Sequence, residues 1–160
     1  IYRSNFKRIS SILIMSCTLL IKLDTKPQTK KIEENDIIYS LNEEEKTASI
    51  IGINKTNSEV LIPKSIIYQT KEYVIVSILE GSFRNSIIKS LKFTQDSKLQ
   101  MIDKDSFYSA SIESITIPSQ VSELREGWCN RTSKINKIEV SPSNQYYKTY
   151  DNLIIGKKII

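Results

Sequence analysis

The sequence contains no histidine among its 160 residues, and this absence excludes much catalytic chemistry. Histidine is the side chain that titrates near neutral pH, so no Ser-His-Asp or Cys-His nucleophile and no His-ligated metal site can form. The two cysteines, Cys17 and Cys129, form no C-x-x-C motif of the kind that zinc ribbons and redox sites use. We therefore expect two ordinary buried thiols, no metal ion and no cofactor.

Glycine is scarce as well, and its four residues are too dispersed to form a phosphate-binding loop. The run of carboxylates Glu43-Glu44-Glu45 is typical of a solvated hairpin tip. The sequence therefore predicts no catalytic residue and no enzyme. What the chain does have is isoleucine: 28 Ile and 5 Val stand against 11 Leu and 2 Ala. Ile and Val suit pleated strands, whereas Leu and Ala favour amphipathic helices, so the fold is predicted to be mainly β.

The charge is mildly basic, with 23 Lys and Arg against 18 Asp and Glu and a net charge of +5. These charges are scattered along the chain. Proteins that bind nucleic acid concentrate positive charge and interleave it with aromatic residues, so no nucleic-acid partner is predicted.

Residues 1–35 are predicted to precede the folded domain as a poorly ordered segment or a frayed helix. Residues 9–23 contain an apolar run that is too short to span a bilayer as a helix. The run is either a signal peptide or an extension outside the fold, and the sequence leaves both open. Residues 24–35 are polar and predict a linker. Contact with a membrane is expected only through an anchor that these residues do not contain.

An internal repeat of 22 to 24 residues organises the rest of the chain. Apolar residues follow the spacings 3, 5, 5, 3 and 2 in the first two units, and the third differs by one extra residue. The three series are Ile75, Ile78, Phe83, Ile88, Leu91 and Phe93; Leu99, Ile102, Phe107, Ile112, Ile115 and Ile117; and Val121, Leu124, Cys129, Ile135, Ile138 and Val140.

Each unit predicts one short strand and one tight turn. The last two apolar residues of a unit are two positions apart, so they point to the same side of a strand. Gly81, Asp105 and Gly127 recur at a position that favours a left-handed turn. A unit with one short strand cannot bury its apolar face alone, so the units must stack as a solenoid with a parallel sheet. The ladder expected along its other wall is Phe83, Phe107 and Cys129.

Residues 36–160 are predicted to form this solenoid of about three units. A hairpin cap covers 36–62, the repeats cover about 75–140, and a terminal hairpin covers 141–160. A further hairpin is expected in the insert at 67–74, with its turn near 69–71. We also expect further sequence after Ile160, because an exposed solenoid end is unfavourable.

The repeat resembles the BspA-like branch of the leucine-rich-repeat family, with Ile in place of most leucines. The pattern I-x-x-I-x-I-P-x-x-V-x-x-I-x-x-x-x-F is carried by residues 112–124 and by Ile102 through Phe107. The resemblance covers about residues 36–160 and departs from the family at Cys129, which replaces the usual Phe, and in the small number of repeats. It implies a binding module of the kind associated with surface antigens and adhesion.

The outward positions of the predicted strands are the candidate binding residues for a protein ligand, such as a cell-surface or host protein. They are Ser90, Lys92, Ser114, Thr116, Lys137 and Glu139. The alternative is that these six are merely solvated strand positions.

Two functions stay open. The resemblance implies a surface-displayed or secreted antigen-like or adhesin-like protein. The unpaired cysteines and the absence of a clear signal peptide favour an intracellular scaffold for protein-protein interaction instead. Asn54-Lys55-Thr56 and Asn130-Arg131-Thr132 are candidate glycosylation sites, and a glycan on Asn54 or Asn130 would exclude the intracellular alternative.

Overall fold

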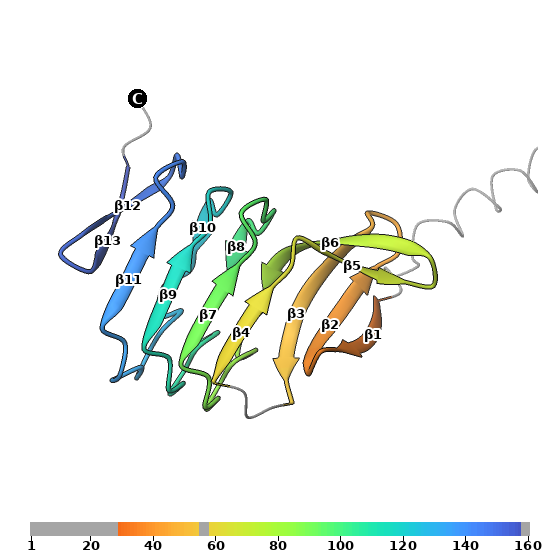
Figure 1. The fold of residues 1–160 in the computed structure, drawn as a ribbon, viewed down its shortest axis with the longest axis horizontal. Helices are drawn as coiled ribbons and strands as arrows, with labels where there is room; N and C mark the ends of the chain where they lie inside the picture. Colours follow the sequence, from red (N-terminus) through yellow and green to blue (C-terminus); the bar gives the residue numbers. More distant parts are fainter. Residues whose placement is uncertain (1–28, 55–57, 158–160) are drawn as a thin grey trace, which may run out of the picture.

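The computed structural model of the chain describes residues 29–54 and 58–157. Within these ranges every regular element is a strand, as Figure 1 shows. The predicted thiol Cys17 and the apolar run at 9–23 lie outside the described residues. The mainly β, solenoid architecture predicted from the repeat is confirmed.

A four-stranded parallel sheet contains the strands predicted from the repeat. One apolar pair in each strand points inward, for example Leu91 and Phe93, and the residues between them point outward. The half-unit before the first full repeat supplies a fourth strand, so the solenoid has one more turn than the three full units. In spatial order the strands are β11 (Lys137–Val140), β9 (Ser114–Ile117), β7 (Ser90–Phe93) and β4 (Glu59–Ile62).

A seven-stranded sheet forms the other wall of the solenoid. Its parallel part runs from β3 through β6 and β8 to β10, one strand for each turn of the chain. The short strands β8 and β10 end at the second apolar residue of their repeats, which is Ile102 in β8 and Leu124 in β10. The members in spatial order are β1 (Thr29–Glu34), β2 (Ile37–Asn42), β3 (Thr47–Ile53), β6 (Lys71–Ile78), β8 (Met101–Ile102) and β10 (Glu123–Leu124), with β5 (Ser65–Tyr68) also paired to β6.

Four antiparallel hairpins interrupt or flank the turns of the solenoid, and one of them joins β1 to β2. β2 and β3 together carry five buried side chains, namely Ile37, Tyr39, Leu41, Ala48 and Ile50. β5 and β6 meet at Gln69-Thr70, and β12 (Tyr147–Tyr150) meets β13 (Leu153–Gly156) at Asp151-Asn152. All four turn residues have positive φ, which is typical of the two-residue turns that match strand twist.

Strand β1 occupies Thr29–Glu34, within the segment for which the sequence predicted a polar linker. That prediction is wrong for these six residues. β1 is an edge strand that pairs with β2 along its whole length, and its exposed positions carry Lys30 and Lys31. Charged side chains on an edge strand discourage pairing with other chains, and the same composition is typical of a linker.

The aromatic ladder along the turns is confirmed for its two phenylalanines. The rings of Phe83 and Phe107 are fully buried and stacked, with centroids 5.0 Å apart. Hydrogen bonds from Phe83 N to Ser106 O and from Phe107 N to Trp128 O hold the turns in register. The third position, Cys129, is a half-buried free thiol, and burial raises its pKa.

The ring that continues the ladder is therefore that of Trp128, which lies edge-on to Phe107 at 5.8 Å. Gly81, Asp105 and Gly127 all have positive φ, as the sequence predicted. Asn85, Ser109 and Arg131 form a second series with positive φ, four residues further along each turn, which the sequence analysis missed.

The Phe107 ring contacts Phe83 and Trp128 and so joins three turns of the solenoid, and its removal should weaken the stacking between them. We expect Phe107→Ala to lower the free energy of unfolding by about 3–5 kcal/mol, because a buried aromatic ring is replaced by a cavity. Urea denaturation followed by fluorescence measures the change. Ile87→Ala is the control, since Ile87 is 52% exposed, and it should change the free energy by under about 0.5 kcal/mol. Equal losses of unfolding free energy in the two variants would contradict the conclusion that the core depends on the stacked rings.

Candidate binding surface on the four-stranded sheet

The outward residues of the four-stranded sheet line up in two rows because the strands are in register. Glu59 pairs with Ser90, Ser90 with Ser114, and Ser114 with Lys137, which makes the first row. The second row lies two residues further along each strand and contains Leu61, Lys92, Thr116 and Glu139. The structure thus brings all six predicted binding residues onto one face.

The six residues differ in how far they reach into solvent. Lys92, Thr116, Lys137 and Glu139 are exposed, whereas Ser90 and Ser114 are half-buried. The hydroxyl of Ser114 donates to the Oγ of Ser90 at 3.4 Å, so these two serines bridge neighbouring strands. The four exposed side chains therefore reach furthest into solvent on this face, and the two serines lie closer to the backbone of the sheet.

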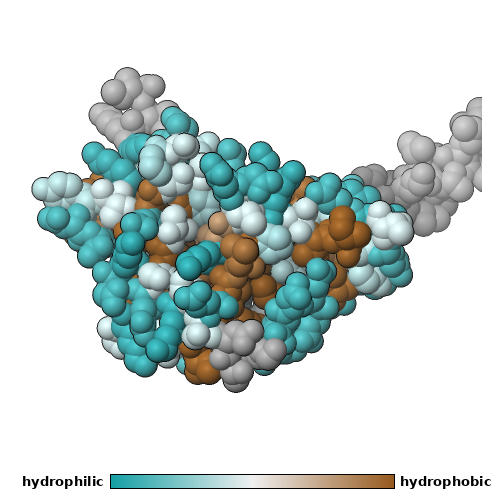
Figure 2. Space-filling model, in the orientation of Figure 1, coloured by the Kyte–Doolittle hydropathy of each residue, from teal (hydrophilic) through white to brown (hydrophobic). Residues whose placement is uncertain are grey.

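Two residues of this face were missed by the sequence analysis, Glu59 and Leu61. Leu61 is 61% exposed, although it begins the row that Lys92 continues. The sequence does mark Leu61 as an outward residue. It directly precedes the Ile62-Pro63 pair that matches Ile117-Pro118 in the repeat, so it corresponds to the outward residue Thr116. Figure 2 shows that the molecular surface in this view is mainly hydrophilic, with apolar patches that interrupt it.

Opposite charges lie close together on the face. Lys92 Nζ lies 3.7 Å from Glu59 Oε2, and Lys137 Nζ lies 3.1 Å from Glu139 Oε1. All four side chains are more than half exposed, so each pair contributes at most about 1 kcal/mol to stability. The pairs can separate at little cost when a partner offers a charge of its own.

A shallow hollow of about 150 Å³ lies where β7 and β9 end. Thr116 of the second row is one of the residues that line it, together with residues of the turns that follow the strands. The hollow is smaller than the 300–1,000 Å³ that pockets for small molecules have. The full lining is Phe93, Thr94, Gln95, Thr116, Pro118, Ser119 and Ser141.

The net charge of +5 does not arise in the described part of the chain. Seven of the 23 Lys and Arg residues but only one of the 18 acidic residues, Asp24, lie outside it, so residues 29–54 and 58–157 carry 16 basic and 17 acidic side chains. The solenoid is close to neutral, and its candidate binding face carries both signs.

The carboxylates at 43–45 lie in the turn between β2 and β3. Glu44 and Glu45 are exposed, and their backbone N–H groups donate to Asn42 Oδ1. Glu43 instead accepts a hydrogen bond of 2.9 Å from the Tyr73 hydroxyl. This bond, together with nearby lysines, lowers the pKa of Glu43, so the carboxylate keeps its charge and is unsuited to donate a proton.

Residues 29–54 and 58–157 contain no group of three or more His, Cys, Asp or Glu side chains that could hold a metal ion. They also contain no helix long and apolar enough to cross a membrane.

These observations define a class of protein: a solenoid of short repeats with a regular polar face, which is the architecture of leucine-rich-repeat modules that bind other proteins. Residues 63–151 match six copies of the BspA type leucine-rich repeat region. The chain belongs to the BspA type leucine-rich-repeat family.

Two solved structures are similar to this chain, and the first of them shows the same fold. The pneumococcal vaccine antigen PcpA is 16% identical, with a TM-score of 0.53, and the match covers 72% of this chain and 39% of PcpA. A leucine-rich-repeat protein from Bacteroides capillosus is 14% identical, with a TM-score of 0.46, and the match covers 69% of this chain and 98% of that protein. This chain thus spans well under half the length of PcpA. No curated protein matches the sequence.

The second row should be dispensable for folding. We expect the triple variant Lys92→Ala, Thr116→Ala and Glu139→Ala to keep its free energy of unfolding within about 1 kcal/mol, because exposed side chains and exposed ion pairs contribute little. Urea denaturation measures this, with Ile115→Ala, a buried residue of the same strand as Thr116, as the destabilising control. A triple variant as unstable as the control would mean that the row has a structural role.

Proposed function

We propose that the outer face of the four-stranded sheet binds a protein ligand and that the second row is its centre. The observation that carries the proposal is the row itself. Leu61 pairs with Lys92 and Thr116 with Glu139, and all four side chains are exposed on the same side of the sheet. A large apolar side chain that is 61% exposed at the end of a polar row has no role in the core.

The composition of the row suits contact with a folded protein surface. Leu61 supplies apolar area to bury, and a few such anchors dominate the binding energy of protein interfaces. Lys92 and Glu139 supply one charge of each sign, which favours one orientation of a partner with the complementary pattern. The neighbouring hollow of about 150 Å³ can take one side chain of that partner.

The binding test uses proteins captured by the immobilised chain from the labelled surface and secreted fraction of cells. We expect the variant Leu61→Ser, Lys92→Ala, Thr116→Ala and Glu139→Ala to bind a purified captured protein at least ten times more weakly, measured by surface plasmon resonance. The control replaces exposed residues elsewhere: Ile67→Ser, Lys98→Ala, Ser122→Ala and Glu126→Ala. Equal affinity of the two variants would refute the assignment of this face.

We further propose that the module acts at the cell surface or outside the cell, as an antigen-like or adhesin-like protein. Membership of the BspA type family supports this, and the pneumococcal protein that shares the fold is a vaccine antigen. The alternative is an intracellular scaffold, which would use the same face. The half-buried free thiol of Cys129 is compatible with either compartment.

The two candidate glycosylation sites differ in their surroundings. Asn130 Nδ2 donates to Asp105 Oδ1 at 3.1 Å and lies so close to Gly127 that a Cβ there would come within 2.5 Å of it. Thr132 of the same sequon is buried. Asn54 and Asn130 are both exposed, and Asn54 Nδ2 donates to the exposed Glu33 at 2.7 Å. A glycan therefore fits Asn54 better than Asn130.

Mass spectrometry of the protein from its native cells tests the compartment. We expect a glycan on Asn54 that a peptide N-glycosidase removes, and labelling of the protein on intact cells by a biotin reagent that does not cross membranes. Recovery of unmodified protein only from the cytosol would contradict the proposal and favour the scaffold.

A further inference from the structure

The terminal hairpin carries four of the seven large apolar side chains that are exposed among the described residues, and these four lie between residues 146 and 155. In the register of β12 and β13, Tyr150 pairs with Leu153 and Lys148 with Ile155, so these side chains share one face. The four apolar residues are Tyr146 (38% exposed), Tyr150 (66%), Leu153 (65%) and Ile155 (40%).

The opposite face of the hairpin is already used. Tyr147 and Ile154 pack against the core. Asn144, which is fully buried, donates from Nδ2 to Pro118 O and Val121 O and accepts at Oδ1 from the N–H groups of Tyr146 and Tyr147. The hairpin is therefore fixed to the last turn, and its outer face is held rigidly in solvent.

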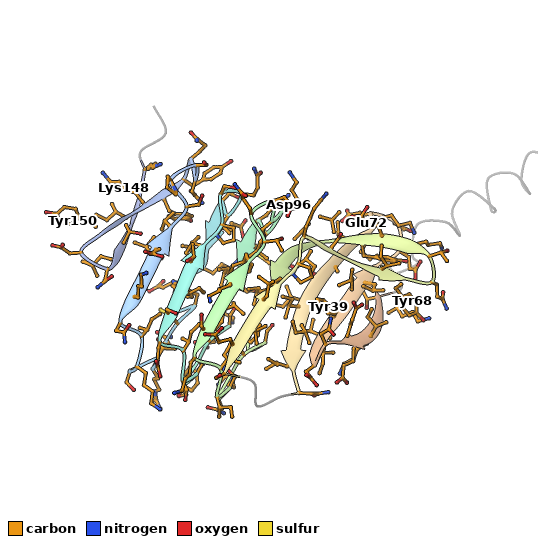
Figure 3. The ribbon with its side chains drawn as sticks, in the orientation of Figure 1. Tyr39, Tyr68, Glu72, Asp96, Lys148 and Tyr150 are labelled. Carbon is orange, nitrogen blue, oxygen red and sulfur yellow. The ribbon has the colours of Figure 1, made fainter. Side chains whose placement is uncertain are left out.

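The position of the hairpin leaves that face accessible. Figure 1 shows β12 and β13 beyond β11, at the end of the molecule. In Figure 3 the side chains of Lys148 and Tyr150 project from this end, away from the solenoid. Among residues 29–54 and 58–157, no other element lies on this side of the hairpin.

The charges on the face are self-complementary. Lys148 lies on the outer face of β12, and Asp151 lies at the tip of the same hairpin. Neither side chain has an ion-pair partner among the described residues. When two hairpins face each other with their tips in opposite directions, Lys148 of one copy lies near Tyr150 and Asp151 of the other, and Leu153 lies near Ile155.

We propose that this outer face is a docking surface for a second copy of the chain, which forms a two-fold symmetric dimer through the terminal hairpins. Each two-fold contact occurs twice, so the pairs Lys148–Asp151 and Leu153–Ile155 are doubled. The face comprises one side of two four-residue strands. Stable complexes bury roughly 800 Å² per partner, so we expect a weak and reversible dimer from so short a hairpin. The dimer leaves both four-stranded sheets free, and the proposal does not depend on the ligand of that sheet.

Sedimentation velocity of the 160-residue chain between about 5 and 500 µM tests the dimer, with an expected dissociation constant on the order of 100 µM. We expect the variant Tyr150→Ser and Leu153→Ser to stay monomeric throughout. The variant Leu61→Ser and Ile67→Ser removes apolar residues of similar exposure elsewhere and should dimerise like the parent chain. A parent chain that is monomeric at 500 µM, or association lost in the second variant but not in the first, would overturn the proposal.

A charge exchange tests the symmetry without changing any apolar contact. Lys148→Asp and Asp151→Lys should each weaken self-association at least ten-fold, because each places like charges opposite each other twice. Lys46 already has positive φ in another hairpin turn, so lysine is tolerated at such a position. An equimolar mixture of the two variants should dimerise again, since each copy then meets the opposite charge. If the mixture associates no better than either variant alone, the two-fold arrangement is wrong.

Discussion

The fold depends on stacking in register between neighbouring turns, because no single turn can bury its own apolar residues. The same offset that sets Leu91 beside Ile115 sets Phe83 on Phe107 on the opposite side of the core. One register therefore aligns the strands, the aromatic ladder and the turns at once. An insertion inside a turn must be absorbed in a loop, and the extra residue of the third repeat lies between Cys129 and Ile135, after the ladder position.

Much of this could be predicted from the sequence, because a repeat converts one-dimensional spacing into three-dimensional neighbours. Ile115 and Ile138 are 23 residues apart and pair across two strands. The outward positions followed from alternation alone, so the candidate face was predictable down to single residues. Strand β1 was not predictable, because an edge strand that pairs on one side only has no apolar pattern to mark it.

The parts of the surface that carry apolar residues were harder to predict. Leu61 resembles an ordinary core residue by type, and the sequence marks its outward position only through the match of Ile62-Pro63 to Ile117-Pro118. The pairing of β4 with β7 and its exposure show that it points outward. Tyr150 and Leu153 belong to a segment in which apolar residues follow one another directly, as in Tyr146-Tyr147 and Leu153-Ile154-Ile155, so its sequence does not show which face packs on the core. The structure resolves this through Asn144, whose four hydrogen bonds fix the hairpin in one orientation.

The solenoid separates stability from recognition. Residues that point inward are constrained by their neighbours in two turns, whereas Lys92, Thr116 and Glu139 contact mainly solvent and can change without disturbing the register. The same separation holds at the end of the molecule, where Ile154 packs inward and its neighbours Leu153 and Ile155 point outward. An alternating strand thus presents one face to the core and the other to solvent, as both the four-stranded sheet and the terminal hairpin do in this chain. The two proposed binding surfaces share no residue, so their partners would not compete for the same side chains.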